Sequence, residues 1–246
     1  MAERPALLLV HGFPLDSRMW RHQAEALSDS FQVLTPDLPG HGVNATGQPA
    51  ADVDAMARFL AAQMDDAGVE RVHLAGFSMG GYVCFAFMHH FGHRVLSLAL
   101  VDTRATADTE AGREARGAMA AQLRSDGARA AADAMLPPMF TAAVPEPVRG
   151  EAERWMLDQA AETLVADVGA MRDRPDSTTI LPGISVPTLV LVGDQDPISP
   201  PADAGDMAAA IRGARLVTIS DAAHLTPVEQ PEQVTGALRA FLTALG

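Results

Sequence analysis

Short apolar runs alternate with helical patterns along the first part of the chain. Residues 6–10, 31–35, 71–77 and 95–101 form short, mainly apolar runs, as do strands that are buried on both faces of a sheet. Residues 52–66 carry apolar side chains at helical spacing, and residues 79–91 are apolar on every side, which predicts a buried helix. Strands that alternate with helices form a parallel sheet covered on both faces, so the predicted fold class is α/β.

The alternation stops between residues 104 and 181. This stretch is rich in Ala, Arg and Glu and is interrupted by glycine and by several prolines, which predicts three or four short helices and no strand. Strand and helix signals resume at residues 188–192, 202–211, 215–219 and 232–245. We therefore expect an α/β core, residues 1–103 and 182–246, with a mostly parallel sheet of about six strands. Residues 104–181 are expected to form an inserted helical cap.

Composition excludes several kinds of chemistry. The formal net charge of −13 argues against nucleic acid and anionic membranes as partners. Cys84 is the single cysteine, which excludes an internal disulfide and a cysteine-rich metal site. The chain has no lysine, which excludes Schiff-base chemistry and a phosphate-binding P-loop. No dinucleotide fingerprint, membrane-spanning run or signal-peptide pattern is present, so we expect a cytoplasmic protein that acts on a small molecule without metal or organic cofactor.

The strongest chemical signal is the segment Gly76-Phe-Ser78-Met-Gly-Gly81, which matches G-x-S-x-G. A strand is predicted before it and a helix after it, which is the context that the motif requires. Such a turn holds the serine hydroxyl clear of the sheet in strained backbone geometry, and the helix N-terminus adds positive partial charge where an oxyanion forms. Ser78 is therefore the candidate nucleophile.

A serine nucleophile needs a base, and the base needs an acid that orients it. In enzymes whose serine lies on such a strand-to-helix turn, the acid follows the serine along the chain and the histidine base follows the acid. Among the eight histidines, only His224, in Asp221-Ala-Ala-His224, follows both Ser78 and a suitable acid. The acid candidates are Asp194 and Asp196, in a turn directly after a strand, one of which we expect to bond the N–H groups of its own turn. Asp102, at the end of another strand, is the third candidate.

These segments together resemble the α/β-hydrolase superfamily, in its capped serine esterase and enol-lactonase-like branch. The resemblance covers nearly the whole chain and rests on five segments: His11-Gly-Phe-Pro14, Pro36-Asp-Leu-Pro-Gly-His-Gly42, Gly76–Gly81, Gly193-Asp-Gln-Asp196 and Asp221–His224. In one respect the chain is expected to depart from the family pattern, in which two antiparallel strands usually precede the His-Gly strand: here the first apolar run starts within six residues of Met1, so about six strands are expected rather than eight.

The resemblance implies a role for each matching residue. Ser78, Asp196 and His224 correspond to the catalytic triad. The backbone N–H groups of Phe13 and Met79 correspond to the oxyanion hole. Cap residues and the loop after the first strand are expected to supply an apolar wall for the substrate, although the same side chains would also pack a small helical cap. The candidates for this wall are Leu15, Met135, Met139, Phe140 and Trp155.

The implied activity is hydrolysis of carboxylic esters or lactones through an acyl-enzyme, with no cofactor. Two alternatives remain open at this stage. The same triad supports perhydrolysis, as in haloperoxidase-like relatives, or cleavage of a carbon–carbon bond. The same scaffold also occurs in ligand receptors or regulatory binding proteins with slow turnover, because a fold does not determine a function.

Overall fold

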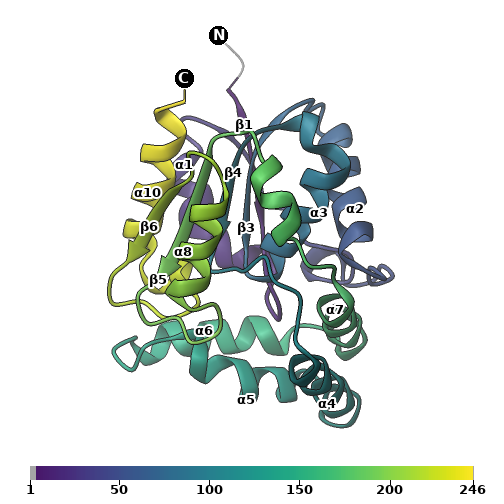
Figure 1. Cartoon of the computed structure of the whole chain (residues 1–246). Helices are drawn as coiled ribbons and strands as arrows, with labels where there is room; N and C mark the ends of the chain where they lie inside the picture. Colours follow the sequence, from purple (N-terminus) through teal and green to yellow (C-terminus); the bar gives the residue numbers. More distant parts are fainter. Residues whose placement is uncertain (1–3, 246) are drawn as a thin grey trace.

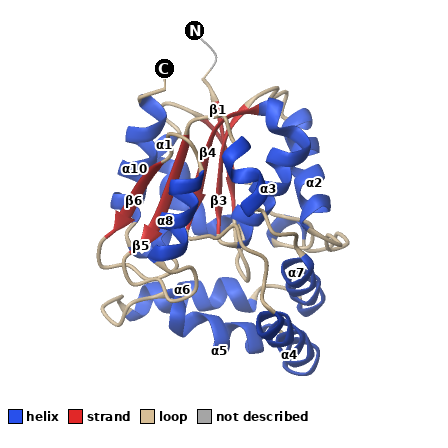
Figure 2. Ribbon diagram, viewed as in Figure 1, coloured by secondary structure: helices blue, strands red, loops and turns tan. Residues whose placement is uncertain are grey.

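The centre of the molecule is a sheet of six parallel strands in the order β2-β1-β3-β4-β5-β6 (Figures 1 and 2). The computed structural model describes residues 4–245. The predicted α/β class and sheet of about six strands are confirmed. The strands are β1 (Ala6–Val10), β2 (Gln32–Leu34), β3 (Val72–Phe77), β4 (Val95–Val101), β5 (Thr188–Gly193) and β6 (Arg215–Ile219).

Ten α-helices and four short 3-10 helices connect these strands within the described residues. The α-helices are α1 (Arg21–Leu27), α2 (Val53–Asp66), α3 (Met79–Phe91), α4 (Glu110–Asp126), α5 (Ala128–Met139), α6 (Glu146–Leu157), α7 (Ala161–Asp173), α8 (Pro201–Ala210), α9 (Thr226–Glu229) and α10 (Pro231–Thr243). The 3-10 helices are η1 (Ser17–Trp20), η2 (Gly42–Asn44), η3 (Gly92–Arg94) and η4 (Thr178–Gly183). No helix among residues 4–245 is both long enough and apolar enough to cross a bilayer.

Two apolar cores lie on opposite faces of the sheet, because successive residues of a strand point to opposite sides. On β1, Leu8 and Val10 pack in the core formed with α2, α3 and α8, whereas Leu7 and Leu9 pack in the core formed with α1 and α10. Cys84 is fully buried on α3 in the first of these cores, and burial raises the pKa of its thiol. This environment favours the neutral thiol, which is a poor nucleophile.

The region between β4 and β5 contains four helices, α4–α7. They lie beyond the carboxyl ends of the strands, whereas both ends of the described chain lie at the opposite end of the molecule (Figure 1). In a parallel sheet all loops that follow the strands meet at one edge, and this edge is where ligands bind in open α/β folds. The helices α4–α7 therefore cover the edge at which the candidate chemical residues gather.

Candidate functional site

Ser78 occupies the sharp turn between β3 and α3, with φ 51° and ψ −113°. A non-glycine residue with positive φ is strained, and such strain persists only where the surroundings fix it. Here the Ser78 N–H donates to the Val101 carbonyl over 2.9 Å, and the Thr103 hydroxyl donates to the Ser78 carbonyl over 2.8 Å. A Cβ at Gly76 would lie 2.3 Å from the Gly80 carbonyl oxygen, and one at Gly80 would lie 2.4 Å from that of Val10. The glycines are thus required by close backbone approach.

Ser78, His224 and Asp196 form one chain of hydrogen-bonding side chains. The His224 Nε2 atom lies 2.9 Å from the Ser78 hydroxyl oxygen, and its Nδ1 atom lies 2.8 Å from Asp196 Oδ2. All three residues are buried, and Ser78 is the most exposed, at 9%. Because a carboxylate only accepts hydrogen bonds, Nδ1 carries the proton and Nε2 faces the serine hydroxyl as an acceptor. This arrangement is competent for proton removal from Ser78.

The two oxygens of Asp196 have different partners. Oδ2 faces His224, while Oδ1 accepts from the N–H groups of Ile198 and Ser199 over 2.8 and 3.0 Å. Asp194 instead accepts from the Ala222 N–H over 3.2 Å, in the loop that carries His224. Asp196 therefore both bonds the N–H groups of its own turn and faces His224. Asp194 instead joins this turn to the loop that carries His224.

Asp102 makes no hydrogen bond to His224 or Ser78 within residues 4–245. Its Oδ1 accepts from the Gly193 N–H over 2.9 Å, and its Oδ2 accepts from the Thr226 hydroxyl. Burial, followed by the negative charge of Asp196, raises the pKa of Asp102 well above its ordinary value. These surroundings favour the neutral acid, which suits a packing role between β5 and the His224 loop better than the stabilisation of a cation.

The loop after β1 brings Phe13 to the same edge as Ser78, because β1 and β3 are neighbours with Val10 opposite Gly76. The Gly12 carbonyl accepts from the Leu15 N–H over 2.9 Å and from His11 Nδ1 over 3.3 Å. In a trans peptide the N–H of the next residue points the opposite way. These two bonds to the Gly12 carbonyl therefore fix the direction of the Phe13 N–H. The N–H of Met79 belongs to the first residue of α3, directly after Ser78.

A family model described as the alpha/beta hydrolase family matches residues 7–237. The chain belongs to the alpha/beta hydrolase family. Among solved structures, this hydrolase is similar to a thermophilic esterase from Thermogutta terrifontis, at 41% identity and a TM-score of 0.93 over 99% of this chain and 92% of that one. It is also similar to the enol-lactonase from Burkholderia xenovorans LB400, at 30% identity and a TM-score of 0.91 over 98% of this chain and 92% of that one. The predicted resemblance to esterases and enol-lactonases is confirmed.

Among curated proteins, the hydrolase is 30% identical to the dihydrolipoyllysine-residue acetyltransferase component of the acetoin cleaving system of Cupriavidus necator. The match covers 96% of this chain and 63% of that protein. The hydrolase therefore spans less than two thirds of the length of the first curated relatives that it matches.

The five apolar residues predicted to contact substrate lie in or against one core. Leu15, Met139, Phe140 and Trp155 are buried in the core that also contains Phe77, and Met135 is half-buried against both cores. The Arg149 guanidinium lies 5.5 Å from the centre of the Phe140 ring, and that of Arg21 lies 5.4 Å from the Trp155 ring. The first contact lies within residues 104–181 and the second joins α6 to α1, so the role of these rings toward substrate stays a prediction.

Polar residues that the sequence did not single out join the end of α5 to the loop that carries His224. Glu229 accepts from the Thr141 N–H over 2.9 Å and from the Ala223 N–H over 2.8 Å. The Leu225 N–H donates to the Met139 carbonyl over 2.8 Å. The segment on each side of His224 is thus bonded to the end of α5. A carboxylate at the last residue of a four-residue helix has no sequence signal that distinguishes it from a solvated one.

No group of three or more His, Cys, Asp or Glu side chains is placed to hold a metal ion within residues 4–245. His11 is fully buried, and its Nε2 accepts from the Leu38 N–H over 3.0 Å, so Nδ1 carries its proton.

We expect His11 of the hydrolase to stay neutral far below the ordinary pKa of histidine. Burial, followed by the proximity of His41, lowers its pKa from 6.5 to about 3. Between these two values the unfolded chain binds more protons at this residue than the folded chain, so the contribution of His11 lowers the unfolding free energy as the pH falls from 6.5 toward 3, by at most about 1.4 kcal/mol per pH unit. An NMR titration of the His11 ring in folded protein tests this, and protonation at pH 6 would contradict it.

Proposed function

We propose that this hydrolase cleaves carboxylic esters, lactones included, through an acyl-enzyme on Ser78. The observation that carries the proposal is the chain of hydrogen bonds from Ser78 through His224 to Asp196, with distances of 2.9 and 2.8 Å. It supplies a nucleophile, a base and an orienting acid within direct reach of one another.

In the first half of the reaction, the Ser78 hydroxyl oxygen attacks the ester carbonyl while His224 Nε2 takes its proton. Negative charge develops on the former carbonyl oxygen, and the N–H groups of Phe13 and Met79 stabilise it. The C–O bond to the alcohol then breaks, and His224 returns the proton to the departing oxygen. An ester between Ser78 and the acyl group remains.

In the second half, water attacks the acyl-enzyme and gives its proton to His224. The second tetrahedral intermediate uses the same N–H groups. It collapses to the free acid and the Ser78 hydroxyl, which regains the proton from His224. Asp196 stays ionised throughout and stabilises the imidazolium that forms in each half.

Support for an ester substrate comes from the esterase and the enol-lactonase among the similar structures. An esterase and a lactonase break the same bond in an open or a cyclic substrate. The proposal for residues 104–181 is that they form a cap that limits the acyl or alcohol group, since α4–α7 cover the edge that carries Ser78 (Figure 1).

Stopped-flow mixing with p-nitrophenyl acetate tests the proposal. We expect a burst of p-nitrophenol equal to the enzyme concentration, followed by steady release, if deacylation is slower than acylation, and steady release alone if it is not. A serine-directed phosphonate should label Ser78 and stop both phases. Binding of esters without turnover would instead identify a receptor on the same scaffold.

We expect Phe140→Ala to change the preference for acyl chain length, because Phe140 lies at the end of α5 and in the core that contains Phe77. Apolar contacts in a pocket are worth about 1–3 kcal/mol each, so the ratio of kcat/KM for acetate and octanoate p-nitrophenyl esters should shift about tenfold or more. The matched control is Phe59→Ala on α2, in contact with the other core. If the kcat/KM ratio of the two esters is unchanged in Phe140→Ala, the Phe140 ring only packs under Arg149 and does not contact the acyl chain.

A further inference from the structure

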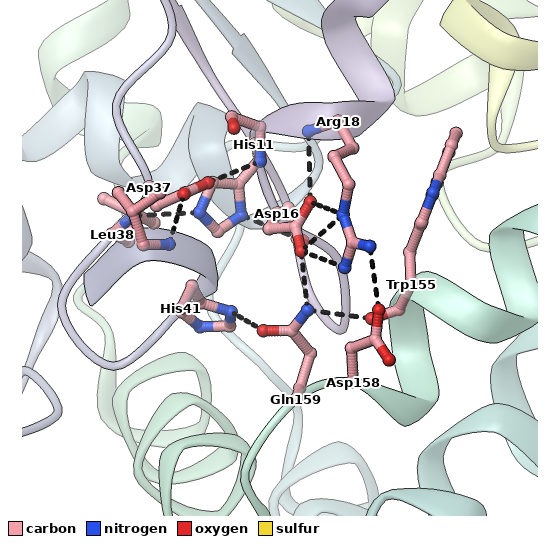
Figure 3. A network of polar contacts seen from close by, with 12 residues as sticks. His11, Asp16, Arg18, Asp37, Leu38, His41, Trp155, Asp158 and Gln159 are labelled. Carbon is pink, nitrogen blue, oxygen red and sulfur yellow. Dashed lines mark hydrogen bonds and ion pairs between the residues drawn. The ribbon is translucent and has the colours of Figure 1, made fainter. Parts of the chain in front are cut away.

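A buried polar network lies where the cap meets the loops after β1 and β2 (Figure 3). Asp16 comes from the first loop and His41 from the second, while Gln159 and Asp167 come from the cap. All four are at least 95% buried. In Figure 3, Gln159 stands between His41 and Asp16, with one end of its amide toward each.

The orientation of the Gln159 amide follows from its partners. Its Nε2 lies 2.8 Å from Asp16 Oδ2 and 2.8 Å from the Trp155 carbonyl oxygen, and both of these atoms are acceptors. The amide nitrogen therefore uses both of its protons on them. Oε1, which only accepts, lies 3.0 Å from His41 Nδ1, so this ring nitrogen carries a proton.

The other ring nitrogen of His41 faces a carboxylate. Nε2 lies 2.8 Å from Asp167 Oδ2, and a hydrogen bond to an ionised carboxylate requires a second proton on the ring. Burial alone lowers the pKa of His41, but Asp167, together with the Gln159 hydrogen bond and the charge of Asp16, outweighs burial and raises it. The hydrogen-bond pattern and the charges agree on an imidazolium.

Neighbouring charged groups are arranged around this cation. The His11 ring, at 4.8 Å between centroids, is neutral, since its Nε2 accepts from Leu38. Asp16 is paired with Arg18 over 2.6 Å, and Arg18 in turn reaches Asp158 of the cap over 2.8 Å. Asp37, in the same loop as His41, accepts from the N–H groups of Ser17 and Val43.

Asp167 depends on His41 for compensation of its charge. Its Oδ1 atom is buried with no hydrogen-bond partner among the described residues, and Oδ2 has His41. A buried carboxylate that loses its only ion partner is strongly destabilised. The pair therefore holds α7 firmly against the loop after β2, where a Cβ at Gly40 would lie 2.5 Å from Thr163 of the same helix.

We propose that His41 is a positioning residue, a buried imidazolium that donates to Gln159 and Asp167 and so couples the seating of the cap to the geometry of the oxyanion hole. The path runs from Asp167 and His41 through Gln159 to Asp16, three residues after Phe13. This inference rests on the proposed role of the Phe13 N–H. It assigns to the cap a part in transition-state stabilisation in addition to substrate selection.

The protonation of His41 is tested by nitrogen-15 NMR of the histidine rings at pH 7, with the His41 signals assigned from their loss in His41→Gln. We expect both ring nitrogens to carry protons in the wild-type protein. In Asp167→Asn the new amide donates to Nε2, which keeps the hydrogen bond and removes the charge, so His41 should lose one proton. A wild-type ring with a single proton at pH 7 would overturn the assignment.

The coupling is tested by the kinetics of the same variants with p-nitrophenyl acetate, whose small acyl group makes few contacts with a cap. A displacement of about 1 Å in a catalytic group costs up to about 10²-fold in rate. We expect His41→Gln to lower kcat by about tenfold or more with KM within about threefold, and Asp167→Asn to lower kcat by less. The control is His90→Gln, which removes an exposed histidine 3.0 Å from Asp54.

Folded His41→Gln with wild-type kcat would leave His41 only a structural role and overturn the proposal. If His41→Gln does not fold, Asp167→Asn replaces it, because this variant keeps the hydrogen bond to His41 Nε2. Wild-type kcat in Asp167→Asn would then overturn the proposal. Failure of the proposed esterase activity is recognised separately, because wild-type protein would then show no hydrolysis that Ser78→Ala abolishes, while the NMR measurement still tests the imidazolium.

Discussion

Ser78→Ala is expected to lower kcat for p-nitrophenyl acetate by about 10⁶, the size of loss seen when the nucleophile of a serine hydrolase is removed. The hydroxyl lies 2.9 Å from His224 Nε2, and without it neither the acyl-enzyme nor the burst of p-nitrophenol forms. Alanine removes one oxygen and keeps the Cβ. The variant should therefore fold, and its circular dichroism spectrum and thermal transition check this.

The matched control is Ser97→Ala, which removes another buried serine hydroxyl, one that lies 2.8 Å from His73 in the sheet. It should cost stability and leave kcat within about twofold of wild type, because a lost hydrogen bond destabilises by about 1 kcal/mol without touching the site. Full esterase activity in Ser78→Ala would refute the acyl-enzyme mechanism outright.

The second large effect is expected for Asp196→Asn. Oδ1 of Asp196 accepts from the N–H groups of Ile198 and Ser199, so the amide oxygen of the variant takes this place and the amide nitrogen faces His224. Nδ1 must then accept, and the ring proton moves to Nε2, where it faces the serine. In a serine protease this exchange of the acid for its amide lowers kcat by about 10⁴, and we expect a loss of that order here.

Two neighbouring aspartates serve as matched controls in the same assay at one pH. Asp102→Asn should retain most activity, because the surroundings of Asp102 favour its neutral form and an amide can still accept from Gly193. Asp194→Asn keeps an acceptor for the Ala222 N–H and should also retain most activity. A loss near 10⁴ at Asp102 or Asp194, with Asp196→Asn nearly normal, would move the assignment of the acid.

The sequence is sufficient for the features that depend on local pattern. The strand, turn and helix around Ser78 follow one another within a few residues, so the motif and its context specify the geometry together. The sequence predicts the strands β1, β3, β4 and β5 to within a residue or two for the same reason, since buried strands are short, mainly apolar runs. Their order in the sheet follows from connection rules rather than from composition.

The remaining features depend on contacts between distant segments. Asp194 and Asp196 are two residues apart in one turn, and only the approach of the His224 loop, so close that a Cβ at Gly193 would lie 2.1 Å from the Ala223 carbonyl oxygen, separates their roles. Gln159, Asp167 and Glu229 are polar residues in a helical region, where the ordinary expectation is a solvated face. Gln159 and Asp167 are buried and Glu229 is half-buried because of how α6, α7 and α9 pack, and no spacing in the sequence encodes this.

The placement of the chain ends has a practical consequence for handling this protein. Both ends of the described chain leave the molecule on the side away from α4–α7 (Figure 1). A purification tag, a fluorescent partner or a tether to a solid support attached at either end would project from that side, leaving α4–α7, which cover the edge that carries Ser78, directed toward the bulk solution. Immobilised preparations oriented through a terminus should thus keep the substrate approach unobstructed, whereas random coupling through surface carboxylates would orient molecules in every direction.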